Sequence, residues 1–201
     1  MTTTTLPSCY YEFREPNSIE ELEESFKIRY ATYKGTDIEC VLEQNGTTLD
    51  IDSYDKYSIP FLIFKYENQT KRVVGNMRLI HDTPTNYAAQ VQQIASNHKI
   101  EHSVSNTPQY YFPSMGYNEL IKIAISDFKE QLNDKNQTLV EVGRFILDKS
   151  ERNRRLAFCL WKCCMPIFRK AIIFISIVPR AIHRVIGLQG ESFFPTRSLF
   201  L

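Results

Sequence analysis

Three arginines that follow a short apolar strand are the residues of this sequence best suited to bind a charged group. Residues 140–147 alternate apolar and polar side chains, which predicts a β-strand, and the turn-forming residues 148–150 end it. The next stretch predicts a helix with Arg152, Arg154 and Arg155 in its first turn. Unpaired backbone N–H groups and guanidiniums at such a position bind phosphate. A strand followed by a solvated helix start is the alternative interpretation.

The same strand carries a second feature, the sequence Glu141-Val142-Gly143-Arg144. A glycine inside a strand indicates a β-bulge or the close approach of another group to the backbone. We therefore expect a distorted strand with a carboxylate and a guanidinium beside the distortion. The rest of the chain is interpreted around it.

The elements that must position this strand follow from hydrophobic periodicity and from turn and cap residues. Strands are predicted at 10–14, 59–66, 72–80, 140–147, 171–178 and 193–201, and helices at 19–33, 87–96, 118–132, from 152 onward and at 180–186. The second and third strands form an expected antiparallel hairpin. This order predicts an α+β fold in which a mixed, largely antiparallel central sheet is flanked by helices in an αβα arrangement.

Composition limits the class of protein. The chain has 201 residues, 43% of them hydrophobic, and a net charge of +1, which predicts one globular domain over residues 1–201 and gives no support for nucleic-acid binding. Residues 81–116, which are polar and interrupted by prolines, are interpreted as a cover or insertion segment. From Arg144 onward there are eleven lysines and arginines and three acids, which would suit an acidic partner or a phosphate-bearing ligand; scattered surface charge is the alternative.

Targeting and metal signals are weak in this sequence. The first residues, MTTTTLPSC, have neither a basic region nor an apolar run, and no apolar stretch is long enough to span a bilayer. These features predict a cytoplasmic protein without a transmembrane segment; association with a membrane surface stays open. The five cysteines are odd in number, which argues against a disulfide framework. His98 and His102 lack a third ligand nearby, so we expect no metal.

Four short pieces of the chain, in order and at suitable spacing, match one known pattern. They are Phe26–Arg29 with Tyr33, Asp52–Asp55, Val73–Ile80 and Glu141–Phe145. Together they resemble the autoinducer synthases that make acyl-homoserine lactones, and the related long-chain N-acyl amino acid synthases. Both groups have the GNAT-like acyltransferase fold, which the resemblance implies for this chain.

The resemblance also implies an activity: an N-acyltransferase that moves a fatty acyl group from acyl carrier protein to the amine of an amino-acid-type acceptor. The product would be a quorum-sensing signal or a lipid. The acyl thioester is then a substrate, and no tightly bound cofactor is expected. A coenzyme A-dependent GNAT N-acyltransferase, and a non-catalytic module that binds acyl chains or the carrier protein, are the two alternatives.

Roles follow from the same resemblance. Glu141 is the candidate general base, with Arg144 beside it, and backbone N–H groups near Gly143 and Phe145 would stabilise an oxyanion. The expected acceptor-binding residues are Arg29, Tyr33, Asp52, Asp55 and Arg78; those for the acyl chain and phosphopantetheine are Phe145, Leu147, Arg152, Arg154, Arg155 and Phe174. For the charged residues the alternative is a network of structural ion pairs, and for the apolar ones it is core packing.

The chain departs from the family pattern at two points. Gly143 stands where the family usually has a serine, and the only tryptophan, Trp161, does not match the one common on the amine side of homoserine-lactone synthases. Ser58, soon after Asp55, is closer to the N-acyl amino acid synthases. These differences argue against S-adenosylmethionine as the amine donor.

Overall fold

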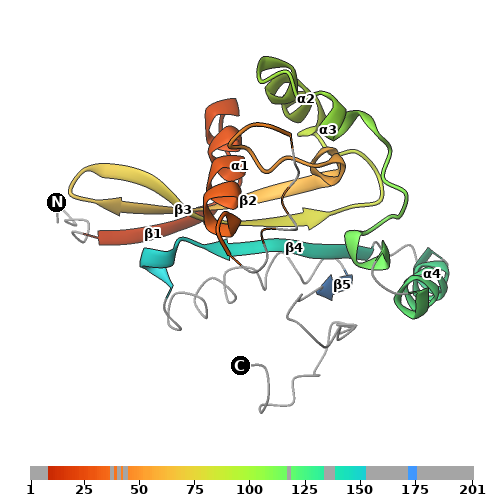
Figure 1. Ribbon diagram of the computed structural model, residues 1–201. Helices are drawn as coiled ribbons and strands as arrows, with labels where there is room; N and C mark the ends of the chain where they lie inside the picture. The colour runs from red at the N-terminus through yellow and green to blue at the C-terminus, as the bar shows by residue number, and fades with distance from the viewer. Residues whose placement is uncertain are drawn as a thin grey trace, which may run out of the picture.

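One five-stranded sheet forms the centre of the protein (Figure 1). The computed structural model describes residues 9–36, 39, 42, 45–116, 119–133, 139–152 and 172–175. The strands lie in chain order, namely β1 (Cys9–Arg14), β2 (Ser58–Glu67), β3 (Thr70–Ile80), β4 (Leu139–Leu147) and β5 (Ile172–Ile175). The pairs from β1 to β4 are antiparallel and β5 is parallel to β4. The predicted α+β fold with a largely antiparallel sheet is confirmed.

Four helices and three short 3-10 turns complete the described part of the chain. The helices are α1 (Ile19–Tyr33), α2 (Ala88–Asn97), α3 (His102–Ser105) and α4 (Glu119–Asn133); the 3-10 turns are η2 (Ser53–Tyr57), η3 (Pro113–Gly116) and η4 (Lys149–Glu151). In Figure 1, α1 crosses the sheet, α2 and α3 lie on the same side, and α4 lies beyond the end of the sheet. The helices predicted from residue 152 and at 180–186, and the strand at 193–201, lie outside the described residues.

Local signals explain the bounds of α1, which match the prediction. The Ser18 side chain accepts a hydrogen bond from the Glu21 N–H, and two acids in the first turn complement the helix dipole. At the other end, the Lys34 N–H donates to the Tyr30 carbonyl and Gly35 adopts a φ of 71°. Glycine is favoured there because the left-handed conformation carries no Cβ penalty.

Residues 81–116, predicted as a cover or insertion segment, contribute to the buried core. Val91, Ile94 and Ala95 of α2 pack in one buried cluster with Leu22 and Phe26 of α1. Further along the segment, Phe112 and Met115 belong to a second buried cluster, which includes residues of α4. The buried members of this cluster are Ile80, Phe112, Met115, Ile125, Leu132 and Leu139. The packing of α1 and the polypeptide before η2 therefore depends on this segment.

The hairpin between β2 and β3 has a tight turn with an unfavourable residue. Asn68 and Gln69 have φ values of 49° and 63°, so both central residues are left-handed. Asparagine tolerates this conformation, whereas glutamine carries a Cβ penalty that glycine avoids.

Replacing Gln69 by glycine is therefore expected to stabilise the protein by about 0.5–1 kcal/mol, net of the extra entropy of the unfolded chain. Urea denaturation followed by circular dichroism measures this change. Gln69→Ala is the matched control, because alanine keeps the Cβ, and it should give no gain. Equal stability of the two variants would show that the turn is not left-handed in solution.

Candidate active site

A β-bulge interrupts the pairing of β3 with β4 at the predicted position. Arg78 pairs with Gly143, but Asn76 pairs with Ile146. The two pairs are therefore two residues apart on β3 and three residues apart on β4. The extra residue falls at 144–145, which confirms the bulge predicted near Gly143. The left-handed residue is Arg144, with a φ of 51°, and not the glycine. A non-glycine residue in this conformation is strained and needs tertiary contacts to hold it.

The register places Glu141 and Arg78 on one face of the sheet. Gly143 lies directly opposite Arg78, and Glu141 lies two residues earlier on β4, so their side-chain directions agree. Glu141 is 2% exposed. A buried carboxylate thus lies next to the bulge, on the same face as the charged side chains described next.

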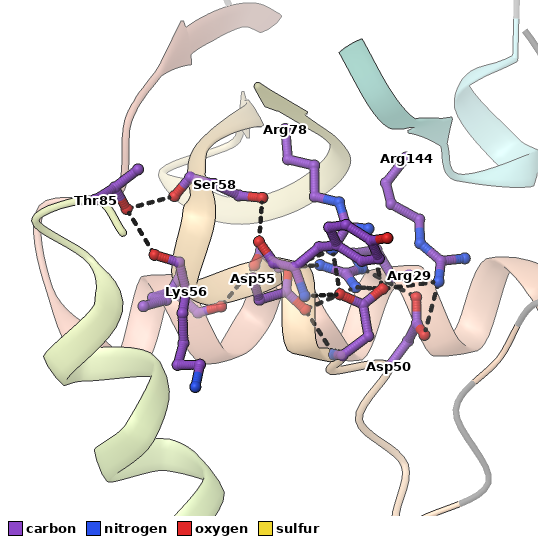
Figure 2. A network of polar contacts seen from close by, with 12 residues as sticks. Arg29, Asp50, Asp55, Lys56, Ser58, Arg78, Thr85 and Arg144 are labelled. Carbon is purple, nitrogen blue, oxygen red and sulfur yellow. Dashed lines mark hydrogen bonds and ion pairs between the residues drawn. The ribbon is translucent and has the colours of Figure 1, made fainter. Parts of the chain in front are cut away.

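Two arginines and two aspartates form a buried network under α1 (Figure 2). Arg29 donates from Nε to Asp50 Oδ2 at 3.0 Å and from Nη1 and Nη2 to the two oxygens of Asp55, at 2.7 and 3.1 Å. Arg78 donates from Nη1 to Asp55 Oδ1 at 2.7 Å. We call Arg29, Asp50, Asp55 and Arg78 the buried brace, because they join α1, β3 and the residues around η2.

A second, partly exposed group lies beside the brace. Arg78 binds Asp52 through Nη1 at 2.8 Å and Nη2 at 3.0 Å, and Arg144 Nη2 lies 3.3 Å from Asp52 Oδ2 and 3.5 Å from Asp50 Oδ1. The Arg144 guanidinium also lies 5.5 Å from the centre of the Tyr33 ring. Side chains of Asp52 and Arg144 are 15% and 13% exposed, against 1% for Arg29. We call Tyr33, Asp52 and Arg144 the rim.

The short 3-10 turn η2 positions the acids of both groups. The Asp52 side chain accepts from the Tyr54 N–H at 2.9 Å, and the Asp55 side chain accepts from the Asp52 N–H at 2.8 Å, which forms a capping box. Ser58 donates to the Tyr54 carbonyl at 2.7 Å and so closes the end of the turn. The carboxylates are therefore fixed by local backbone hydrogen bonds before they meet the arginines.

The structure brings together six of the predicted site residues and adds one. Arg29, Tyr33, Asp52, Asp55, Arg78 and Arg144 all belong to the brace or the rim. Asp50, which the sequence analysis did not assign, is fully buried and binds Arg29. A sequence signal existed, because Asp50 and Asp52 are two apart immediately before η2, but it does not reveal which of the acids meets α1.

Electrostatics keeps Asp52, Arg29 and Arg78 ionised. Burial alone would raise the pKa of Asp52, but the charge and hydrogen bonds of Arg78 lower it more, so the net pKa lies well below its usual range. The Asp55 carboxylate and its neighbours overcome the effect of burial on Arg29 and Arg78 and raise the pKa of both. The ion pairs thus persist at neutral pH.

This predicts a loss of stability in acid. A carboxyl whose pKa is lower in the folded state contributes stability above its unfolded pKa, about 3.9 for aspartate, and that contribution is lost as the pH falls through the folded pKa. The free energy of unfolding should therefore fall between about pH 5 and pH 2, and less steeply in Asp52→Asn. Urea titrations at several pH values test this. The exposed Glu130→Gln variant is the control and should keep the wild-type slope.

A separate carboxylate fixes the end of β4. Glu151 accepts hydrogen bonds from Tyr11 Oη at 2.6 Å and Lys65 Nζ at 3.1 Å, and from the Arg72 guanidinium. The bond to Glu151 raises the pKa of Tyr11 to about 12. Arg152 follows, and its Nε donates to the Leu147 carbonyl at 3.1 Å. Side chains of β1, β2 and β3 therefore bind Glu151, which immediately precedes the basic segment.

Two of the described residues expected to contact the acyl chain and phosphopantetheine, both on β4, differ in burial. Phe145 lies in the bulge and is 42% exposed, whereas Leu147 is buried in a small cluster with Ile63 and Val74. Phe174 pairs with Glu141 through the backbone. Arg154 and Arg155 lie outside the described residues.

Other features of the described residues do not enlarge the site. An open cavity of about 300 Å³ lies near the end of α1, but no predicted site residue lines it; its lining is Tyr30, Lys34, Glu39, Leu42, Asn45, Gly46, Thr47 and Thr48. Among the described residues, no group of three or more His, Cys, Asp or Glu side chains could hold a metal ion. Within the same part of the chain, no helix has both the length and the apolar character needed to cross a membrane.

Comparison with known proteins gives one family match for part of this chain. Residues 28–111 match the family model described as an acetyltransferase (GNAT) domain. The chain has a GNAT-like fold. The GNAT match includes all four residues of the brace, and it ends before Glu141 and the bulge. A search of curated protein sequences finds no match.

Three solved structures resemble this GNAT-like chain at low sequence identity. FeeM, an N-acyl amino acid synthase from uncultured soil microbes, has 14% identity and a TM-score of 0.48; the alignment covers 86% of this chain and 74% of FeeM. BjaI, a CoA-dependent acyl-homoserine lactone synthase solved with MTA, has 17% identity and a TM-score of 0.38, with 78% and 58% covered. The AHL synthase LasI has 12% identity and a TM-score of 0.39, with 83% and 71% covered.

Proposed function

We propose that this protein is an N-acyltransferase that transfers a fatty acyl group from a thioester of acyl carrier protein to the amine of an amino-acid-type acceptor. The observation that carries the proposal is the β4 bulge. It places a strained arginine, a half-buried glycine and a buried carboxylate within four residues, beside a charged rim. The match of residues 28–111 to the GNAT domain family supports acyl transfer as the class of reaction.

The reaction needs a base and a site for negative charge. Glu141 accepts a proton from the acceptor ammonium, directly or through a water molecule, and the neutral amine attacks the thioester carbonyl carbon. The resulting oxyanion receives hydrogen bonds from backbone N–H groups turned out of the ladder at the bulge. The C–S bond then breaks and the amide carbonyl re-forms. The nitrogen gives up its second proton to the leaving thiolate, while the first proton passes from Glu141 to bulk water.

The rim and the brace have different roles in this proposal. Rim residues Tyr33, Asp52 and Arg144 are accessible enough to contact a polar acceptor, and a guanidinium beside a carboxylate suits a molecule that carries an ammonium and a carboxyl-derived group. Of the brace residues, Arg29 and Asp55 are buried and bonded to each other, so we assign them to positioning. They hold η2 and α1 at a fixed distance from β3.

The donor is assigned from the charge of the C-terminal part. Acyl carrier protein presents its acyl chain on a phosphopantetheine arm with one phosphate, which suits a basic segment rather than a glycine-rich loop. Arg152 begins that segment. Its Nε donates to the Leu147 carbonyl, and in this proposal its two terminal nitrogens contact the phosphate.

Product formation tests the proposal. Purified protein is incubated with a set of acyl carrier protein thioesters and pooled amino acids, and acylated amino acids are sought by mass spectrometry. Parallel reactions with the same acyl groups on coenzyme A separate the donor classes. Acylated product from the carrier-protein thioesters is expected; product from coenzyme A alone would replace the donor assignment.

A non-catalytic carrier-binding module is the second candidate, and Gly143 is the observation that favours it. The family pattern usually has a serine at this position, so the site lacks a hydroxyl. This alternative predicts saturable binding of acyl carrier protein without turnover, and absence of product together with such binding would overturn the enzyme proposal.

A further inference from the structure

Gly143 is not required by the conformation of the backbone. Among the described glycines, positive φ values occur at Gly35 and Gly46, and at the bulge the left-handed residue is Arg144. Glycine within a strand lowers stability because it loses more conformational entropy on folding than other residues do, and because it has no side chain to pack. The feature that Gly143 contributes is therefore its small size.

A buried hydrogen-bond donor lies beside the space over Gly143. A Cβ at this position would lie 3.8 Å from Arg78 Nε and 3.3 Å from Ile80 Cδ1. Arg78 is 3% exposed, and its Nε has no hydrogen-bond partner among the residues that the structure describes, whereas Nη1 and Nη2 are bonded to Asp52 and Asp55. Leaving a buried donor unpaired is unfavourable, and such groups are uncommon in folded proteins.

We infer that Gly143 determines acceptor specificity, because its missing side chain allows a carboxyl oxygen of the acceptor to accept a hydrogen bond from Arg78 Nε. The inference rests on the proposed function and extends it to the chemical group that the site selects. Among the described residues, the atom closest to a Cβ at this position is Ile80 Cδ1, the end of a side chain that can change rotamer.

The position fits an α-amino acid in length. Glu141 and Gly143 are two residues apart on one strand face, so their Cα atoms are separated by about 7 Å. An α-amino acid with a hydrogen bond at each end spans a comparable length. Its ammonium then lies at Glu141 and its carboxylate at Arg78, so the amine meets the base while the carboxylate fixes the orientation.

The charges around Arg78 permit this arrangement. The three arginines of brace and rim, Arg29, Arg78 and Arg144, balance the three aspartates, and the remaining acid, Glu141, lies at the ammonium end of the acceptor. A hydrogen bond from a charged guanidinium to a carboxylate contributes about 1.5–3 kcal/mol. This predicts that an amino acid binds about tenfold or more tightly than the amine that lacks its carboxylate.

Binding measurements on two substitutions test the inference. Isothermal titration calorimetry compares the common amino acids with their decarboxylated amines on wild type, Gly143→Ala and Gly143→Ser. Wild type is expected to prefer the amino acid by about tenfold or more, and both variants should lose most of that preference, since a Cβ fills the space and a serine Oγ occupies the donor. Gly116→Ala is the matched control, because its Cβ meets the Tyr110 ring at 3.4 Å and lies away from the site.

A second variant separates a blocked ligand from a disturbed fold. Ile80→Val removes the Cδ1 methyl that a Cβ at residue 143 would meet. If Gly143→Ala acts only by clashing with Ile80, the double variant Ile80→Val/Gly143→Ala regains the wild-type preference; if it acts by filling the ligand position, the preference stays lost. Regained preference would overturn the inference, as would equal binding of amino acid and amine by wild type.

Folding stability gives a readout that does not depend on catalysis. A serine at residue 143 can satisfy Arg78 Nε and an alanine cannot, so Gly143→Ser should be more stable than Gly143→Ala in urea. If no acylated product forms but this order and the binding preference hold, the proposed reaction fails while the carboxyl site stands. If product forms and Gly143→Ser keeps the wild-type preference, the inference alone fails.

Discussion

Replacing Arg29 by methionine is expected to lower the free energy of unfolding by about 3–5 kcal/mol. The guanidinium is 1% exposed and holds Asp50 and Asp55, which are themselves 0% and 4% exposed. Removing it leaves two buried carboxylates without their main partner, and uncompensated buried charge is among the costliest changes in a protein interior. A domain of this kind has only about 5–15 kcal/mol of stability, so the variant should be close to unfolding.

Lys27→Met is a control on the same helix. It makes a similar chemical change two residues earlier, where the side chain is 44% exposed and pairs with Glu23 and Glu24 on the surface. Exposed pairs of this kind contribute about 0.2–1 kcal/mol. Urea denaturation of both variants, followed by circular dichroism, should show a large difference. Arg29→Met with stability near that of Lys27→Met would mean that the buried brace does not form in solution.

The brace explains why the sequence predicts the helices better than the site. Helix α1 was predictable because its cap, its apolar stripe and Gly35 are local signals. The partners of Arg29 are not local, since Asp50 and Asp55 lie 21 and 26 residues further along the chain. The resemblance assigned Arg29 and Asp55 to one site, but only the packing of η2 under α1 shows that they bind each other and that Asp50 completes the group.

The bulge shows the same limit at a single residue. Glycine is the usual signal for an irregular strand, so the sequence predicted the position of the bulge correctly. It gave no sign that the strained residue is Arg144, because intrinsic preference disfavours a left-handed arginine. Contacts with Asp50, Asp52 and Tyr33 hold that conformation, and they depend on α1 and η2 being in place. Strain held by tertiary contacts is typical of functional sites.

Replacing Glu141 by glutamine is expected to lower kcat for acyl transfer by about 10²-fold or more. Glutamine has nearly the same shape, so the buried position and the pairing of β4 should be retained, but the amide cannot accept the proton of the ammonium. The measurement is the rate of acyl-amino acid formation under saturating thioester, with thermal unfolding of both proteins as the check on folding. Glu119→Gln, on the exposed first turn of α4, is the control and should keep the wild-type rate.

The pH dependence separates a base from a structural carboxylate. If Glu141 removes the proton, the wild-type rate rises with pH as the carboxyl ionises, and Glu141→Gln loses that limb while its residual rate still increases as the free amine becomes more abundant. If Glu141 is instead a structural carboxylate, Glu141→Gln should lower the rate by the same factor at every pH and should reduce the unfolding temperature. Unchanged turnover in both Glu141→Gln and Arg144→Ala would rule out the assignment of the reaction to the β4 bulge, and it would leave the charged rim as a binding site only.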